Sequence, residues 1–305
     1  MSSTESSLAL STTTAAAGRH LYGMGVTALG VFILSFEAVL VRLAATSGWN
    51  VAFWRGVFIT LALALLLLWR EGGAGFRVFR RGLAPWLCAF LFGTSGFFFV
   101  LSLTLTKAAN TVVLASSAPI FAALLSWLWL RERVPLRTWI AIAVAFAGVV
   151  LVFAGSMSGD GWLGNLCALV PALSLGGTFT VLRRHPDLPR MPLVWGGGVV
   201  TALFALPLAE PLTLSWSGYA AVALQGGLVL PASMVLMAVG TRYLSAPEVS
   251  LFLLIEATLG PVWVWLAVGE QPPALTFVGG AMILVTLAVH AWLGAVRTQS
   301  TLQPR

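Results

Sequence analysis

The fold is decided by residues 116–153, SSAPIFAALLSWLWLRERVPLRTWIAIAVAFAGVVLVF. This stretch predicts an apolar helix, a short polar turn and a second apolar helix. A fainter copy, LIEATLGPVWVWLAVGEQPPALTFVGGAMILVTLAVHA, follows at residues 254–291. The two copies share five residues at one constant offset. These pairs are Trp127/Trp265, Leu128/Leu266, Glu132/Glu270, Pro135/Pro273 and Thr138/Thr276. The shared pattern indicates an internal repeat.

The composition is that of a membrane protein. Of the 305 residues, 59% are hydrophobic and 9% are charged, and the mean hydropathy is +0.94, whereas soluble domains carry about 25% charged residues. The formal net charge is +7, but the basic residues are scattered between apolar runs. This distribution is typical of topology signals and not of a nucleic-acid-binding patch. Cys88 and Cys167 lie in apolar segments, which predicts packing roles and no disulfide or metal framework.

Crossing the hydrocarbon core as a helix takes about 20 apolar residues, and the chain holds ten such runs, which predicts an all-α polytopic membrane protein. The predicted spans are 21–44, 50–69, 84–106, 110–130, 137–154, 162–182, 192–208, 217–239, 246–268 and 274–296. They form a first repeat, 21–154, and a second repeat, 162–296, with five helices in each. Residues 1–20 are Ser/Thr-rich and predict a disordered cytoplasmic tail, and residues 297–305 predict another cytoplasmic tail.

The positions of the basic residues predict the orientation. When the loops are assigned alternately to two sides, fourteen of the seventeen basic residues fall on the side of the termini, and only Arg42, Arg55 and Lys107 fall on the other. The positive-inside rule therefore predicts that both termini are cytoplasmic. Five helices per repeat is an odd number, so the RERVP turn faces the cytoplasm and its copy GEQPP faces outside. Inverted repeats of this kind are common in secondary transporters, which bind substrate near the midplane where the repeats meet.

The closing segment of the first repeat carries a family resemblance. Its residues are Pro119, Phe121, Ala123, Leu125, Trp127, Glu132, Trp139 and Gly148. This pattern, with ten helices in two halves, resembles the EamA branch of the drug/metabolite transporter superfamily, and within it the chain looks most like the YddG-type exporters of aromatic amino acids. In the second copy Ala257 stands at the position of Pro119. The resemblance implies export of small metabolites across the inner membrane by alternating access, without ATP and without a bound cofactor.

Glu256 is the first candidate for a functional residue, because it lies near the middle of the ninth predicted span. An ionisable side chain at that depth costs about 2.5–3.5 kcal/mol on insertion scales, so it is a functional hypothesis by default. Three roles fit it: binding a substrate ammonium, carrying a coupling proton, and pairing with an arginine to join two helices.

Glu37, Arg42 and Arg55 form a second candidate group, predicted to lie at similar depth toward the outer side. Arg55 occupies a place where EamA-type proteins usually carry arginine. One interpretation is a salt bridge that ties the first two helices together. The other is an outer gate, or a docking point for a substrate carboxylate, which an arginine fork binds bidentately.

Further candidates are aromatic, small or helix-breaking residues. Phe97, Phe98 and Trp195 are candidates to line the cavity, where an aromatic side chain can stack on an aromatic substrate. Packing or lipid contact is the commoner role of such aromatic side chains. Ser116 and Ser117 are further candidates to line the cavity. Three prolines at mid-span are candidate hinges, because proline frees a carbonyl and permits a kink. They are Pro119, Pro231 and Pro261.

Several motifs are absent from the sequence. There is no nucleotide-binding G-x-x-x-x-G-K-[ST] loop and no H-E-x-x-H motif, and the three histidines are too far apart for a metal site. We therefore expect no enzyme activity and no metal. The prediction is an exporter of amino acids, aromatic ones favoured, with protons as a candidate coupling ion. The alternatives are a broad-specificity drug/metabolite exporter and a channel-like protein without a transport cycle.

Overall fold

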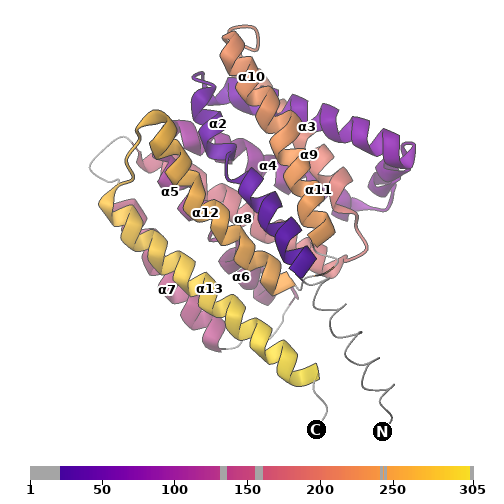
Figure 1. The fold of residues 1–305 in the computed structure, drawn as a ribbon. Helices are drawn as coiled ribbons and strands as arrows, with labels where there is room; N and C mark the ends of the chain where they lie inside the picture. Colours follow the sequence, from indigo (N-terminus) through magenta and orange to yellow (C-terminus); the bar gives the residue numbers. More distant parts are fainter. Residues whose placement is uncertain (1–20, 131–135, 155–160, 241–242, 244–245, 303–305) are drawn as a thin grey trace, which may run out of the picture.

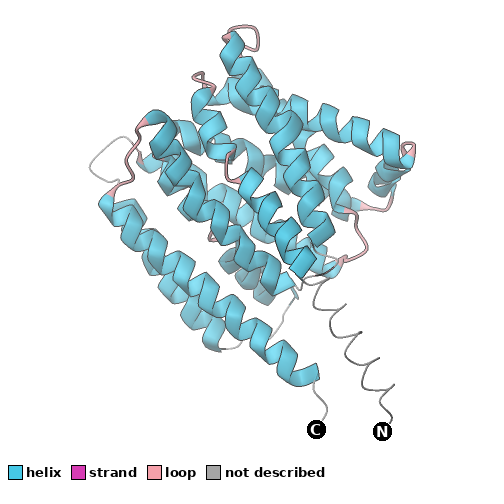
Figure 2. Ribbon diagram, viewed as in Figure 1, coloured by secondary structure: helices cyan, strands magenta, loops and turns pink. Residues whose placement is uncertain are grey.

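The structure is a computed structural model that describes residues 21–130, 136–154, 161–240, 243 and 246–302. In this part of the chain it contains helices and loops and no strands (Figure 2). The predicted tail 1–20 and the RERVP turn lie outside the described residues. The first helix covers residues 21–34. The later α-helices are α2 Glu37–Leu43, α3 Gly48–Glu71, α4 Leu83–Leu105, α5 Ala108–Ala115, α6 Ala118–Leu130, α7 Leu136–Ala154, α8 Trp162–Arg184, α9 Arg190–Ala205, α10 Trp216–Leu224, α11 Leu230–Gly240, α12 Ala246–Val268 and α13 Ala274–Leu302.

The apolar helices make the chain a multi-pass membrane protein. Seven segments of the described residues are long and apolar enough to cross a bilayer. They are Leu21–Leu43, Gly48–Glu71, Leu83–Leu105, Ala108–Trp129, Trp162–Leu182, Arg190–Leu208 and Trp216–Met237. The three other predicted spans coincide with shorter apolar segments, Trp139–Val152, Ile255–Val268 and Ala274–Thr286. The apolar runs therefore located the helices to within a few residues.

Three spans are interrupted in ways that hydropathy does not predict. The first span breaks at Ser35 and Phe36, and the fourth breaks at Ser116 and Ser117. At each break a serine hydroxyl donates to a backbone carbonyl of the preceding turn, which competes with the regular helical hydrogen bonds. The eighth span contains a π-helical segment, Gln225–Val229. In addition, α13 continues to Leu302, through most of the predicted tail 297–305, because no Gly or Pro interrupts residues 297–302.

Helices from the two halves of the chain pack closely on one another. In Figure 1, α13 lies alongside α7, and the two helices are in contact, as are α3 and α9. Glycines permit these approaches: a Cβ atom added at Gly148 would lie 2.7 Å from the carbonyl oxygen of Gly279, and one added at Gly56 would lie 2.6 Å from that of Gly198. Small residues at helix contacts let backbones approach, which favours association in lipid.

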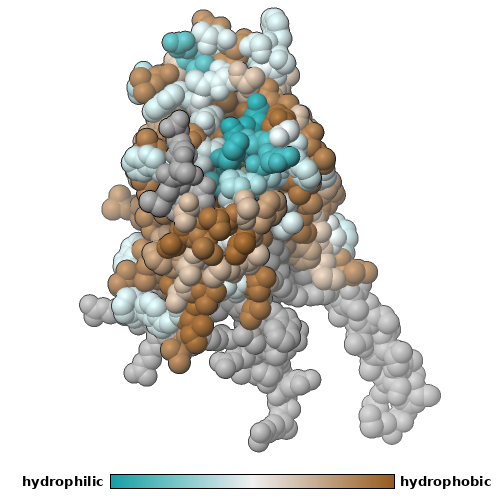
Figure 3. Space-filling view, turned by 90° about the vertical axis from the view of Figure 1, so that its left-hand side faces the viewer, coloured by the Kyte–Doolittle hydropathy of each residue, from teal (hydrophilic) through white to brown (hydrophobic). Residues whose placement is uncertain are grey.

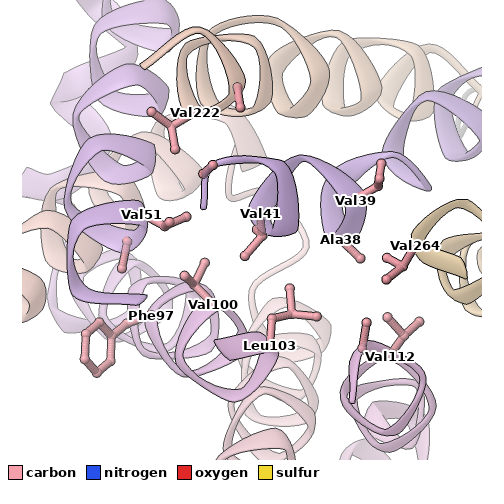
Figure 4. Packing of buried hydrophobic residues seen from close by; sticks show 14 of the residues in the cluster. Ala38, Val39, Val41, Val51, Phe97, Val100, Leu103, Val112, Val222 and Val264 are labelled. Atoms are coloured by element: carbon pink, nitrogen blue, oxygen red, sulfur yellow. The ribbon is translucent and has the colours of Figure 1, made fainter. Parts of the chain in front are cut away.

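A central apolar cluster surrounds α2 (Figure 4). Val39 and Val41 from α2 belong to it, together with Phe97 of α4, Val112 of α5 and Val264 of α12. The interrupted first span thus lies between helices that come from both halves of the chain.

The outer surface is largely apolar. Brown and tan side chains cover much of the face in Figure 3, and the largest group of hydrophilic side chains lies in its upper half. Leu65, Phe146 and Phe277 are between 64% and 69% exposed. A continuous apolar surface of this kind is typical of a lipid-facing protein.

Candidate functional site

The first feature of the site is a buried ion pair between Glu37 and Arg55. Glu37 is the first residue of α2, directly after the interruption at Ser35 and Phe36, and Arg55 lies in the third turn of α3. Arg55 Nη2 donates to Glu37 Oε1 at 2.5 Å, and the two side chains are only 9% and 7% exposed. Since removing one member of such a pair leaves an uncompensated buried charge, each charge depends on the other.

A glycine provides the space for the Arg55 guanidinium. A Cβ atom added at Gly96 of α4 would lie 2.5 Å from Arg55 Nη1 and 3.1 Å from Thr201 Oγ1 of α9. A Cβ atom added at Gly226 would lie 2.8 Å from the backbone carbonyl oxygen of Arg55. The arginine is therefore held among α3, α4, α9 and the π-helical segment, and any side chain at position 96 would push against its guanidinium.

Glu256 lies in the middle of α12 and close to this pair. Its carboxylate is near enough to Glu37 and Arg55 to interact electrostatically with both. Glu256 is half-buried, and among the described residues no hydrogen bond or ion pair engages its carboxylate. Two acids and one arginine thus share a small region inside the bundle, with one carboxylate in excess.

The face of α12 that carries Glu256 packs against the interruption of the first span. Trp263, two turns after Glu256, donates from Nε1 to Ser35 Oγ at 2.9 Å. Its ring stacks on Phe36, with centroids 5.0 Å apart and planes 9° from parallel. Aromatic surface therefore lies next to the charged group.

Arg42 does not join the Glu37–Arg55 pair, although the sequence grouped the three residues together. Its Nη2 atom lies 2.8 Å from Glu270 Oε2, in the connection between α12 and α13, and also donates to the carbonyl oxygen of Thr106 at 2.7 Å. Glu270 Oε1 accepts the backbone N–H of Ala108 at 2.6 Å. This second pair links the ends of α2, α4 and α5 to the second half of the chain.

Buried polar side chains extend this linkage. Thr276 of α13 donates to Asn110 of α5 at 2.5 Å. Thr106 and Asn110 donate to Asn165 Oδ1 of α8 at 2.9 and 3.2 Å. The network fastens α5, α8 and α13 at the end of the bundle that carries Arg42 and Glu270.

The candidate aromatic residues are packed in other places. Phe97 is buried against Trp49 and Phe204, and half-buried Phe98 contacts the edge of Phe97. Trp195 of α9 contacts Phe76 and Phe79 of the short helix Ala74–Arg80. Phe97 shares the central apolar cluster with Ala257, the neighbour of Glu256, whereas Trp195 packs in a separate cluster.

The candidate serines and prolines lie at helix interruptions or inside a helix. Ser116 and Ser117 donate their hydroxyls to backbone carbonyls of α5, so both are engaged within their own segment. Pro119 is the second residue of α6, and Pro231 is the second residue of α11, directly after the π-helical segment. Pro261 lies inside the continuous helix α12. Among the described residues, no group of three or more His, Cys, Asp or Glu could hold a metal ion.

Sequence reasoning missed two residues of interest. Glu270 was part of the repeat but was not selected as a site residue; its place in the repeat was the signal that could have found it. Gln225, a lone amide in the apolar run ALQGGLVL, was overlooked, and an amide in such a run is itself a signal.

Comparison with known proteins decides the family. The model of the EamA-like transporter family matches residues 21–154. A probable terminal-alkyne amino-acid exporter of Streptantibioticus cattleyicolor is 30% identical over 212 residues, which are 64% of this chain and 68% of that protein. The chain belongs to the EamA-like transporter family. It is therefore a membrane transporter.

Two further similarities extend over most of this EamA-like chain. The pseudopaline exporter CntI of Pseudomonas aeruginosa is 26% identical over 276 residues, covering 86% of this chain and 93% of that protein. A solved crystal structure of another protein has a TM-score of 0.61 and 20% identity, covering 89% of this chain and 96% of that one. The structural similarity shows the fold alone.

Proposed function

We propose that this EamA-like protein is a secondary transporter of the inner membrane that exports amino acids, aromatic ones favoured, or related small metabolites by alternating access. Both termini are cytoplasmic in this proposal, as the positive-inside rule predicts. The name of the Streptantibioticus relative, a probable amino-acid exporter, supports this substrate class.

The observation that carries the proposal is the position of Glu256 beside the Glu37–Arg55 pair. An amino acid is a zwitterion, so its site needs a negative and a positive group close together in a place shielded from water. Glu256 supplies a carboxylate that no described side chain neutralises by direct contact, and it binds the substrate ammonium. Arg55 supplies the donors that suit a carboxylate. The Phe36–Trp263 stack adds aromatic surface beside these groups.

The packing supports two inverted repeats. α3 and α9 are the second helices of the two halves and contact one another, and the fifth helices, α7 and α13, do the same. A two-fold axis in the membrane plane brings equivalent helices together in this way. In this arrangement Glu37 and Arg55 come from the first repeat and Glu256 comes from the second, so the site lies where the repeats meet.

The second ion pair supports a conformational cycle. Arg42 and Glu270 lie at the end of the bundle that the charge distribution assigns to the outside. In the proposed cycle this pair and the Asn110–Asn165 network close the outer end, and they separate when the two halves rock to release substrate. Glu256 is also the proposed carrier of a coupling proton, since it is the acid at the site without a direct partner among the described residues.

Substitution of Glu256 tests the proposal. The Glu256→Gln variant keeps the size of the side chain and removes its charge, so it is expected to reach the membrane but to lose counterflow of labelled amino acids in proteoliposomes. Glu71→Gln, at the exposed end of α3, is the matched control and keeps wild-type transport. Unchanged counterflow in Glu256→Gln would remove Glu256 from the binding site.

A broader exporter is the second candidate, favoured by the similarity to a pseudopaline exporter over most of the chain. A competition panel separates the two candidates. Excess unlabelled phenylalanine, alanine, a purine, a sugar and a cationic dye are each added to the counterflow assay. Competition by amino acids alone supports the first candidate, and competition by several classes supports the second.

A further inference from the structure

The eighth span changes its helical geometry at one place. It runs as α10, becomes π-helical over Gln225–Val229 and continues as α11. The N–H of Leu230 donates to the carbonyl oxygen of Gln225, five residues earlier. Such π-segments insert one residue into an α-helix and frequently occur at functional sites. Here the segment begins at Gln225, the amide in an otherwise apolar run.

The Gln225 side chain is fully buried and without a visible partner. Its relative exposure is 0%, and neither Nε2 nor Oε1 has a hydrogen-bond partner among the described residues. A buried polar group left unsatisfied costs about 1–3 kcal/mol, and native proteins contain few of them. Because both the donor and the acceptor are unused, a molecule that carries both kinds of group is the natural complement.

The π-helical segment packs directly on the arginine of the site. Gly226, the next residue, is the one whose added Cβ would lie 2.8 Å from the backbone carbonyl oxygen of Arg55, and the segment also contacts α2, which carries Glu37. In Arg55 itself, Nη2 is engaged with Glu37, while the buried Nε atom has no partner within the described chain. Two neighbouring segments of the bundle thus hold unused hydrogen-bond donors.

We infer that Gln225 is a substrate-binding residue that recognises the carboxylate end of the transported zwitterion; this inference rests on the proposed function. The Nε2 amide donates to the substrate carboxylate together with Arg55 Nε, and Oε1 accepts from an N–H of the substrate. Binding then satisfies groups that are unsatisfied in the empty transporter, and a compound without the carboxylate gains less from them. The alternative is a structural water that occupies the same groups throughout the cycle.

Paired substrates separate the two possibilities. KM is measured in proteoliposomes for phenylalanine and for phenethylamine, which lacks the carboxylate. Gln225→Met removes both polar atoms at nearly constant size, so it is expected to raise the KM of phenylalanine about tenfold or more, because the site loses a buried hydrogen bond to a charged group. Phenethylamine keeps only the N–H contact with Oε1, so its KM, or its inhibition constant if it is not transported, is expected to rise clearly less than the KM of phenylalanine, by about threefold or less.

Two further variants keep the test decisive. Ser233→Ala is the control, since Ser233 is also fully buried in the same span but donates to the carbonyl oxygen of Val229; its KM is expected to equal the wild-type value. If Gln225→Met does not fold, Gln225→Asn, which retracts the amide by one methylene, takes its place with the same expected selectivity. Equal effects on the two compounds, or none, would overturn the role of Gln225. Absence of amino-acid counterflow in the wild type would instead overturn the proposed function.

Discussion

Arg42 and Glu270 come from opposite ends of the sequence, yet Nη2 of one lies 2.8 Å from Oε2 of the other. Arg42 lies near the end of the first span, and Glu270 lies in the turn of the second copy of the repeated segment. The side chains are 21% and 13% exposed. A contact between the first and second halves, placed at one end of the bundle, is the kind of contact that a rocking transporter has to break and remake.

Reversing the charge of Arg42 is expected to open the outer end of the protein. Arg42→Glu places two acids together, and Arg42→Glu/Glu270→Arg restores the pair in the opposite sense. Opening is measured with Val264→Cys, a position 1% exposed in α12, in a background without Cys88 and Cys167. A membrane-impermeant thiol reagent added outside labels the single charge-reversal variant faster than the double variant. Equal labelling of both would show that the pair does not control access.

The Glu37–Arg55 pair is expected to behave as one unit in stability. Glu37→Gln leaves the arginine without its partner and lowers stability by about 3–5 kcal/mol, whereas Glu37→Gln/Arg55→Gln loses much less. The temperature of half-unfolding in detergent measures both. Because Glu256 can serve as a substitute partner, the same variants are also compared in a Glu256→Gln background. Losses that simply add would contradict the coupling of the pair.

Gly96 is expected to be required for transport because of the space it leaves. In Gly96→Ala the new methyl group meets Arg55 Nη1 at 2.5 Å, so the guanidinium shifts and transport falls by about tenfold or more. Gly25→Ala is the matched control, since an added Cβ there meets nothing within 4 Å. A Gly96→Ala variant with wild-type KM and maximal rate would contradict the placement of Arg55 in the site.

The orientation predicted from the basic residues is tested by labelling of single cysteines in intact cells. Gln271→Cys lies in the exposed GEQPP turn, and Arg81→Cys lies in the exposed connection before α4. An impermeant reagent added outside is expected to modify position 271 and to spare position 81 until the membrane is opened. Modification of both positions, or of position 81 alone, would contradict the inverted arrangement.

The sequence located the helices well because hydrophobic length alone determines which segments can cross a bilayer. The ninth span, for example, was predicted at 246–268, which is also the extent of α12. The interruptions were not predictable in the same way. Ser35 and Phe36 include no Gly or Pro, and the π-turn at Gln225 adds one residue without changing the average hydropathy. Both depend on contacts with other helices, such as the hydrogen bond from Trp263 to Ser35.

The ionisable residues of the candidate site could be selected from the sequence, but which ion pairs they form could not be predicted. Ionisable residues within apolar runs are conspicuous, so Glu37, Arg55 and Glu256 could be selected as candidates from their positions alone. The choice of partner depends on how distant helices pack, so the pairing of Arg42 with Glu270 could not be read from the sequence. Gln225 carries no charge and was overlooked, although an uncharged amide is also costly to bury without a partner.

Counterflow tests the transport mechanism most directly. Proteoliposomes that contain the wild-type protein are loaded with unlabelled phenylalanine and diluted into a trace of labelled phenylalanine. A carrier with alternating access accumulates label transiently above the outside concentration, the rate saturates with phenylalanine, and Glu256→Gln removes the overshoot. Equilibration without an overshoot, at a rate that rises linearly with concentration, would contradict alternating access and indicate a channel.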